Sequence, residues 1–223
     1  MAATNHGRPE RAIRLAPKAG KPSVNLRLMR VAVFGGPSQL VFEEAEFGNF
    51  ECARAPSNVC IYDRFEPTSP FHRFFILDPA GTKGKEILAG KIKNENGLNF
   101  WNLSPDGKSI VIQKSQNPSD APVLRIFNLA TGAARDIPVP EAGLIFGMNW
   151  AADSNSIWLG AFMGRGAWGT RSGILNVDLT GKTRVLLKGS NPELLYAVPS
   201  PDGHRLAVGA DSRTSNIWLL ENF

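Results

Sequence analysis

The motif SPDG followed by an apolar run constrains the fold of this chain more than any other feature. Residues 104–112 read SPDGKSIVI, and related sequences recur as AADSNSIWL at 151–159 and SPDGHRLAV at 200–208. Each copy places a tight turn before a short apolar stretch, which is typical of a strand-turn-strand unit. A period of roughly fifty residues therefore predicts equivalent pieces of structure that stack against one another.

A second repeated mark lies later in each unit. Asp78, Asn128 and Asp178 are fifty residues apart, and each closes a strand-like run shortly before a glycine. An Asp or Asn side chain bonds the backbone two residues on, and glycine tolerates positive φ, so the mark indicates a hairpin turn. With a weaker copy of the first turn at 55–58, the chain contains four such units. It therefore predicts an all-β fold, a β-propeller of about four blades with four antiparallel strands each.

The two ends of the chain do not match whole units. We expect a basic flexible leader at 1–25 and a β-propeller segment at 26–223. The expected blades are a partial one at 26–48, whole ones at 49–98, 99–146 and 147–194, and a partial one at 195–223. Because four blades is the lower limit for propellers, we interpret the chain as an incomplete arc of a larger propeller. The unpaired edge strands of such an arc favour self-association.

Positive charge is concentrated near the N-terminus. The net charge is +5, but residues 1–30 contain seven Lys and Arg against one Glu, so the rest is close to neutral. A basic, proline-containing leader is typically a solvated tail, and we expect no nucleic-acid partner for this segment. No window approaches the roughly 20 apolar residues that span a bilayer, and no secretion signal begins the sequence. We therefore expect no membrane partner and, for the chain as written, a cytoplasmic location.

Two cysteines bracket a turn-like stretch. Cys52 and Cys60 flank residues 54–58, which would fold their two strands into an antiparallel hairpin. Adjacent strands meet the limit of about 7 Å between Cα atoms that a disulfide needs, so an oxidising compartment would permit the bond. Two buried free thiols are the alternative, and the sequence leaves both open. The spacing fits no zinc site, because four ligands are required.

A glycine-rich segment between two expected strands is the candidate binding loop. Residues 164–169 satisfy GxGxxG, but a dinucleotide site needs a helix after the motif, and a strand-like run follows instead. We therefore expect no cofactor there. Trp168, flanked by Arg165 and Arg171, has the composition of an interface hot spot, and we expect these three residues to contact a partner.

The sequence contains no recognisable catalytic or metal-binding set. It has no G-x-S-x-G, Walker A, HExxH or calcium-loop pattern. The histidines, His6, His72 and His204, lack nearby partners and are expected to be solvent-exposed. The acids that recur in register, Asp106, Asp153 and Asp202, are explained by hydrogen bonds within their turns. We expect no catalytic residue, no cofactor and no metal, and the chain is not expected to be an enzyme.

The SPDG turn followed by an apolar strand resembles the TolB-type, or PD40, propeller repeat of bacterial proteins. The same WD40-like module occurs in the propellers of prolyl-oligopeptidase-like peptidases. The match is clearest at Ser104–Gly107 and Ser200–Gly203, covers residue 99 onward well, and covers 26–98 more loosely. Residues 35–60 and 215–223 are similar to C-terminal propellers that some bacteria attach to winged-helix regulators or serine/threonine kinases.

The resemblance implies a function in binding. In such regulators and kinases the propeller is regarded as the sensing or partner-binding part, although a propeller fold alone is compatible with many functions. We therefore expect a non-catalytic module for protein or peptide interaction or ligand sensing, part of a larger bacterial regulatory protein. The alternative is the gating propeller of a prolyl-oligopeptidase-like serine peptidase that lacks its hydrolase domain. A fragment of a receptor kinase or TolB-like protein would be extracytoplasmic.

Overall fold

A computed structural model describes residues 10–15, 25–45, 47–64, 69–77, 84–93, 100–114, 121–164, 171–189 and 194–211. The regular elements within these ranges are all β-strands, β1 to β17. Backbone contacts divide the chain into two compact units. The first unit consists of Met1–Ala53 and Asn58–Gly97, and the second consists of Arg54–Ser57 and Leu98–Phe223.

The first unit contains two antiparallel sheets whose strands follow one another in chain order, β1-β2-β3 and β4-β5-β6-β7. Its strands are β1 (Glu10–Leu15), β2 (Asn25–Ala32), β3 (Gln39–Ala45), β4 (Phe47–Cys52), β5 (Cys60–Arg64), β6 (Arg73–Leu77) and β7 (Glu86–Ile87). The second of these sheets has the four strands expected of a blade. The first has three, and β2 and β3 correspond to the expected third and fourth strands.

Strand β1 differs from the expectation that residues 1–25 form a leader without regular structure. It pairs antiparallel with β2, with Glu10 opposite Ala32 and Leu15 opposite Arg27. The free edge of a strand exposes a row of unpaired N–H and C=O groups, and any neighbouring extended segment satisfies them. Positive charge and a proline-containing context identified the leader, but neither prevents a six-residue segment from pairing with an open edge.

The two sheets of the first unit pack through aromatic and aliphatic side chains. Leu28 and Phe42 from the first sheet contact Tyr62, Phe75 and Leu77 from the second. The ring centroids of Phe42 and Tyr62 are 4.9 Å apart, and those of Tyr62 and Phe75 are 5.1 Å apart. Large rings at these separations contribute both buried area and favourable ring geometry. The core of this unit therefore lies between its two sheets.

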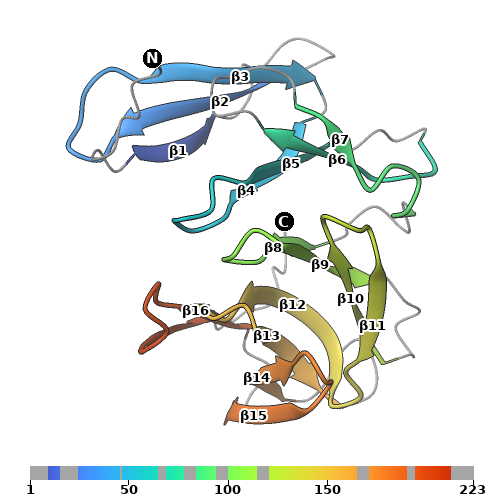
Figure 1. The fold of residues 1–223 in the computed structure, drawn as a ribbon. Helices are drawn as coiled ribbons and strands as arrows, with labels where there is room; N and C mark the ends of the chain where they lie inside the picture. The colour runs from blue at the N-terminus through green and yellow to red at the C-terminus, as the bar shows by residue number, and fades with distance from the viewer. Residues whose placement is uncertain are drawn as a thin grey trace, which may run out of the picture. The chain divides into compact units, whose positions relative to one another are not determined.

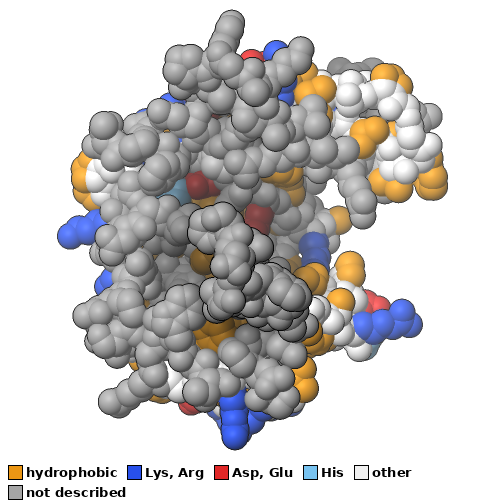
Figure 2. Space-filling model, turned by 180° about the vertical axis from the view of Figure 1, so that it is seen from behind, with side chains coloured by type: hydrophobic (Ala, Val, Ile, Leu, Met, Phe, Trp, Pro, Cys, Tyr) orange, Lys and Arg blue, Asp and Glu red, His pale blue; other side chains and the backbone are white. Residues whose placement is uncertain are grey.

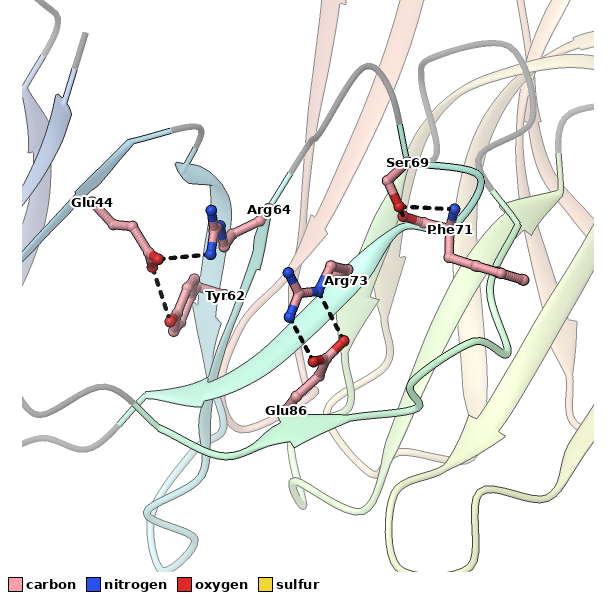
Figure 3. A network of polar contacts seen from close by, with 7 residues as sticks. All are labelled: Glu44, Tyr62, Arg64, Ser69, Phe71, Arg73 and Glu86. Carbon is pink, nitrogen blue, oxygen red and sulfur yellow. Dashed lines mark hydrogen bonds and ion pairs between the residues drawn. The ribbon is translucent and has the colours of Figure 1, made fainter. Parts of the chain in front are cut away.

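Charged side chains reinforce this packing, as Figure 3 shows. Glu44 accepts a hydrogen bond from the Tyr62 hydroxyl at 3.1 Å and lies 2.9 Å from Arg64 Nη1. Burial, followed by the negative charge of Glu44 and its hydrogen bond, raises the pKa of Tyr62. Arg73 donates two hydrogen bonds to Glu86, at 3.0 and 2.7 Å, and these bonds lower the pKa of the Glu86 carboxyl.

The second unit contains three successive antiparallel sheets, ordered β8 to β11, β12 to β15, and β16 with β17. Its strands are β8 (Trp101–Leu103), β9 (Ser109–Lys114), β10 (Val123–Asn128), β11 (Ala134–Pro138), β12 (Ala142–Trp150), β13 (Ser156–Met163), β14 (Ser172–Asp178), β15 (Thr183–Lys188), β16 (Leu194–Pro199) and β17 (Leu206–Asp211). Strand β12 contacts β8 of the preceding sheet and β16 of the following one, so the sheets lie side by side in chain order (Figure 1). This confirms the predicted fold class of four-stranded antiparallel blades.

The core of the second unit is a continuous apolar cluster shared by neighbouring sheets. Leu124, Ile145, Leu159 and Leu175 are among its fully buried members. Two polar side chains link the innermost strands across the sheet boundaries. Trp150 Nε1 donates to the carbonyl of Asn102 at 3.1 Å, and Asn149 Nδ2 donates to the carbonyl of Ala197 at 3.0 Å. The repeat therefore positions the first strands of consecutive sheets against one another.

The surface of the described residues mixes apolar and charged side chains. Figure 2 shows hydrophobic side chains at several places on the visible face, with Lys and Arg scattered singly among them. Phe34, in the turn between β2 and β3, is 88% exposed. Within the described ranges, no helix has the length and hydropathy needed to cross a bilayer.

Candidate functional site

Four turns that are equivalent in the repeat join the first and second strands of successive sheets. They lie between β4 and β5, β8 and β9, β12 and β13, and β16 and β17. Residues 54–57, at the tip of the first of these turns, belong to the second unit, as do the other three turns. The tip of the first turn and the other three turns therefore lie within the second compact unit.

Three of these turns are closed by an aspartate, as the sequence predicts. In each, the carboxylate oxygen Oδ1 accepts a hydrogen bond at 3.0 Å from the backbone N–H two residues on: Asp106 from Lys108, Asp153 from Asn155, and Asp202 from His204. A hydrogen bond from the Ser200 hydroxyl, with help from the His204 N–H, lowers the pKa of Asp202. The recurring acids thus shape the turns.

In the three turns that contain an aspartate, the fourth residue has a left-handed backbone. Gly107 and Gly203 have φ of 71° and 74°, and Ser154 occupies the same conformation with φ of 60°. Glycine adopts this region without steric cost, whereas serine does not. The Ser154 hydroxyl accepts a hydrogen bond from the Asp106 N–H at 3.1 Å, which links its turn to the preceding one.

Arg54 links the first turn to two others. Its backbone N–H donates to the carbonyl of Pro105 at 2.8 Å, and its guanidinium Nη1 donates to the carbonyl of Pro201 at 3.1 Å. Arg54 thus connects the first, second and fourth turns of the unit.

These turns surround a pocket of about 540 Å³. Its lining combines proline and alanine with two cationic and two anionic side chains and two serines. The lining residues are Arg54, Ala55, Pro56, Ser57, Pro105, Asp106, Lys108, Ala152, Asp153, Ser154 and Pro201. A volume of a few hundred Å³ with a small number of placed polar groups is typical of small-ligand and peptide side-chain sites.

Most of the binding loop expected from the sequence lies outside the described residues. Arg165 and Trp168 lie outside the described residues, and Arg171 is exposed, its carbonyl accepting a hydrogen bond from the Met163 N–H. This loop follows β13, whereas the turn that lines the pocket precedes β13. Seven steps along a strand, at about 3.3 Å each, separate the two by roughly 23 Å. Gly164 and Arg171, which flank this loop, therefore lie at the opposite end of the sheet from the pocket.

Cys52 and Cys60 are directly opposite each other on β4 and β5. Their Cα atoms are 4.0 Å apart, and the two sulfur atoms are joined in a disulfide. The flanking bond from the Ala53 N–H to the Val59 carbonyl makes theirs a non-hydrogen-bonded pair, in which side chains approach closely. The disulfide closes the hairpin whose tip contains Arg54.

The histidine environments differ from the sequence expectation in one case. His204 is exposed in its turn, as expected, and His6 lies outside the described residues. His72, expected to be exposed, is 7% exposed, and its Nε2 lies 2.5 Å from Oδ2 of Asp63, which is 4% exposed. The prediction was wrong because Asp63, nine residues earlier, reaches His72 only once β5 and β6 pair.

The structure describes only part of the remaining sequence motifs. Gly164 begins the GxGxxG segment with φ of 89°, residues 165–169 lie outside the described ranges, and the next element is strand β14. In the part of the chain that the structure describes, no group of three or more His, Cys, Asp and Glu side chains is arranged to hold a metal.

Comparison with known proteins identifies the architecture. No protein-family model matches the sequence, and no curated protein matches it. Among solved structures, TolB from Acinetobacter baumannii is 20% identical with a TM-score of 0.61, over 89% of this chain and 46% of that one. Puromycin hydrolase is 15% identical with a TM-score of 0.54, over 92% and 32%. A prolyl endopeptidase structure is 17% identical with a TM-score of 0.53, over 74% and 26%.

These similarities concern architecture. The chain spans about half the length of TolB and smaller shares of the two hydrolases. The shared feature is the succession of four-stranded antiparallel blades that β4 to β15 form in this chain. The chain therefore has the fold of a TolB-like β-propeller, and it corresponds to part of one.

Proposed function

We propose that this chain is a non-catalytic propeller module that binds a protein or peptide, using the pocket formed by the four repeated turns. The observation that carries the proposal is the convergence of these turns on one pocket of about 540 Å³. Binding residues in folded scaffolds are found mainly on loops that a rigid framework positions. Here the framework is the stacked sheets of the second unit, whose turns line the pocket together with residues 54–57.

The polar groups of the pocket support binding rather than turnover. Asp106 and Asp153 each hold their own turn through Oδ1, and Ser154 accepts the Asp106 N–H. A general base or nucleophile needs a reactive group within hydrogen-bond reach of a second catalytic group. These side chains are instead engaged with the backbone. We further propose that the module senses or recruits a partner within a larger bacterial regulatory protein.

Selection of binding peptides tests this function. A displayed library of random peptides is panned against the full chain, and the recovered peptides are measured against the chain and against Asp153→Ala. Peptides that use the pocket should bind the variant more weakly, and Asp136→Ala, on β11 outside the pocket, should bind like wild type. Equal binding to both variants and to wild type would remove the pocket from the proposal. Hydrolysis of a peptide or ester abolished by one pocket substitution would make the chain an enzyme.

The second candidate is the gating propeller of a prolyl-oligopeptidase-like serine peptidase. The specific support is the structural similarity to a prolyl endopeptidase, of which the chain covers 26%. This candidate requires a hydrolase domain encoded with or beside the chain. Mixing the chain with that domain should change its activity on long peptides while leaving short substrates unaffected. A genomic neighbourhood without a hydrolase domain eliminates it.

A further inference from the structure

Arg54 is the cation of the pocket that is held in place at two points. Its backbone N–H donates to the Pro105 carbonyl at 2.8 Å, and Nη1 donates to the Pro201 carbonyl at 3.1 Å. The residue is partly buried, unlike a surface arginine that samples many rotamers. Its guanidinium is therefore positioned before any ligand arrives, which lowers the entropic cost of binding.

The charge of Arg54 has no matching anion. Among the described residues, the structure records no ion pair for its guanidinium, and only one of its five N–H groups donates a hydrogen bond. The nearby carboxylates are engaged in their own turns: Asp106 Oδ1 with Ser104 Oγ and the Lys108 N–H, and Asp153 Oδ1 with the Asn155 N–H. A partly desolvated cation without a partner is unfavourable, and an anionic ligand group would relieve this.

The walls of the pocket favour a ligand with an apolar body. Pro56, Pro105 and Pro201 line it together with Ala55 and Ala152. Proline rings are rigid and have no N–H, so they offer apolar surface with little entropic cost. The volume of about 540 Å³ accommodates one or two amino-acid residues rather than a folded element.

The charge balance of the lining distinguishes a carboxylate from a more highly charged anion. Arg54 and Lys108 are opposed by Asp106 and Asp153, so the lining is neutral overall. A single negative charge against Arg54 forms a bidentate pair, as guanidinium and carboxylate geometry allows. A dianion such as phosphate adds repulsion from both aspartates.

We infer that the pocket binds a peptide carboxylate, from a free chain end or an acidic side chain, through Arg54, with the aliphatic part of that residue against the prolines. The inference rests on the proposed peptide-binding function and specifies the chemistry of its ligand. It assigns to Arg54 the recognition role that the sequence suggested for the loop at 165–171.

Titration of the isotope-labelled full chain, followed by NMR, tests the inference. N-acetyl-leucine represents a free chain end, the α-amide of N-acetyl-glutamate represents an acidic side chain, and N-acetyl-leucinamide is the neutral control. At least one carboxylate probe should shift the amide resonances of Asp106 and Ser154, whose turns are linked. The probe that binds identifies the source of the carboxylate. Inorganic phosphate should bind more weakly than that probe.

Substitution of Arg54 is the second part of this test. Arg54→Gln should weaken the carboxylate probe by about tenfold or more, the usual effect of losing a charged hydrogen bond, and leave N-acetyl-leucinamide unchanged. Arg54→Lys keeps the charge but not the fork, so its loss should be smaller, which controls for misfolding of the glutamine variant. Arg184→Gln, on β15 outside the pocket, should bind like wild type.

The outcomes separate this inference from the function on which it rests. Equal binding of acid and amide, unchanged affinity in both Arg54 variants, or stronger binding of phosphate overturns the carboxylate assignment. If selected peptides still need the pocket in that case, the proposed function stands. Failure of every selected peptide to depend on the pocket overturns the proposed function itself.

Discussion

The two units of this chain stabilise similar blades by different means. In the first unit, Asp63 and His72 are both buried, with Oδ2 of Asp63 2.5 Å from Nε2 of His72. The carboxylate of Glu44 binds both the Tyr62 hydroxyl and the Arg64 guanidinium. In the second unit, a single apolar cluster extends across neighbouring sheets. The buried polar side chains recorded in its described residues are the serines Ser104 and Ser172. A four-stranded blade therefore tolerates two buried ionisable side chains when they bind each other and a nearby backbone N–H.

Gly48 shows how closely the first unit is built around that pair. A Cβ atom at Gly48 would lie 2.6 Å from both carboxylate oxygens of Asp63. The adjacent Asn49 N–H donates to Asp63 Oδ1 at 2.5 Å. Because Gly48 on β4 has no side chain, the carboxylate of Asp63 on β5 fits beside it.

Removal of the buried carboxylate should have the largest effect on the first unit. Asp63→Ala leaves His72 and the Asn49 N–H without their partner, and breaking a buried pair in this way costs about 3–5 kcal/mol. Thermal unfolding together with hydrogen exchange should show the loss in the peptides of the first unit. Glu43→Gln is the matched control, because Glu43 pairs with Arg27 at the surface and should cost less than about 1 kcal/mol. Equal effects of the two variants would mean that the buried pair is unimportant.

Truncation of the apolar cluster should have a comparable, slightly smaller effect on the second unit. Leu159 is fully buried in β13, and Leu159→Ala should cost about 2–5 kcal/mol through lost burial and a residual cavity. Leu159→Met keeps most of the volume and should cost less than about 1.5 kcal/mol. Hydrogen exchange should locate the loss in β12, β13 and β14. Protection lost mainly in β4 to β6 would contradict the division into two units.

The parts of the fold predicted from sequence are those encoded by local turn chemistry. The turns at 104–107 and 200–203 contain the Asp and Gly that their backbone geometry requires, so the strands on either side were predictable. The pocket was not, because its lining comes from turns about fifty residues apart that meet only when the blades stack. The sequence did contain one signal for the pocket, because equivalent turns of a repeat lie at the same end of their blades. His72 was misjudged for the same reason, since its partner is brought by strand pairing.

Opening the disulfide should lower the stability of the first unit, which contains both cysteines. Cys52 and Cys60 are separated by 8 positions and close a short loop. Such a crosslink lowers the conformational entropy of the unfolded chain and so stabilises the folded protein by about 2–3 kcal/mol. The double variant Cys52→Ser, Cys60→Ser should therefore lower the Tm, as should a reductant added to wild type. The reductant should leave the double variant unchanged. A Tm of wild type that does not respond to reductant would show that the thiols are free in solution.

Lowering the pH should remove the contribution that one surface ion pair in each unit makes to stability. Hydrogen bonds from Arg73 lower the pKa of Glu86 from its ordinary value of 4.5, and those from Arg125 lower the pKa of Asp136 from 3.8. A lowered folded-state pKa stabilises the protein above the ordinary value, and this contribution is lost as pH falls through the folded-state pKa. Both pairs are about one-third exposed, so each contributes about 0.5 kcal/mol.

Unfolding measured between pH 7 and pH 3 checks this expectation. Glu86→Gln should be less stable than wild type at pH 7, and the difference should shrink as the pH falls below the ordinary pKa of the carboxyl; Asp136→Asn should behave alike. If either variant keeps a constant difference from wild type across this range, its pair does not contribute through ionisation. Similar effects in the two units would show that they differ in their cores and not in their surface pairs.

The smallest expected effect is that of a glycine at Ser154, a position where the second unit has a polar link between sheets. Ser154→Ala keeps the strained left-handed backbone and loses the bond from the Asp106 N–H, so it should cost about 1 kcal/mol. Ser154→Gly loses the same bond but relieves a strain of similar size, so it should change stability by only a few tenths of a kcal/mol. Denaturant midpoints of the two variants measure the difference. If glycine costs as much as alanine, the backbone strain at Ser154 is negligible. A loss above about 2 kcal/mol in both would mean that polar links, and not the apolar cluster alone, hold the sheets of this unit together.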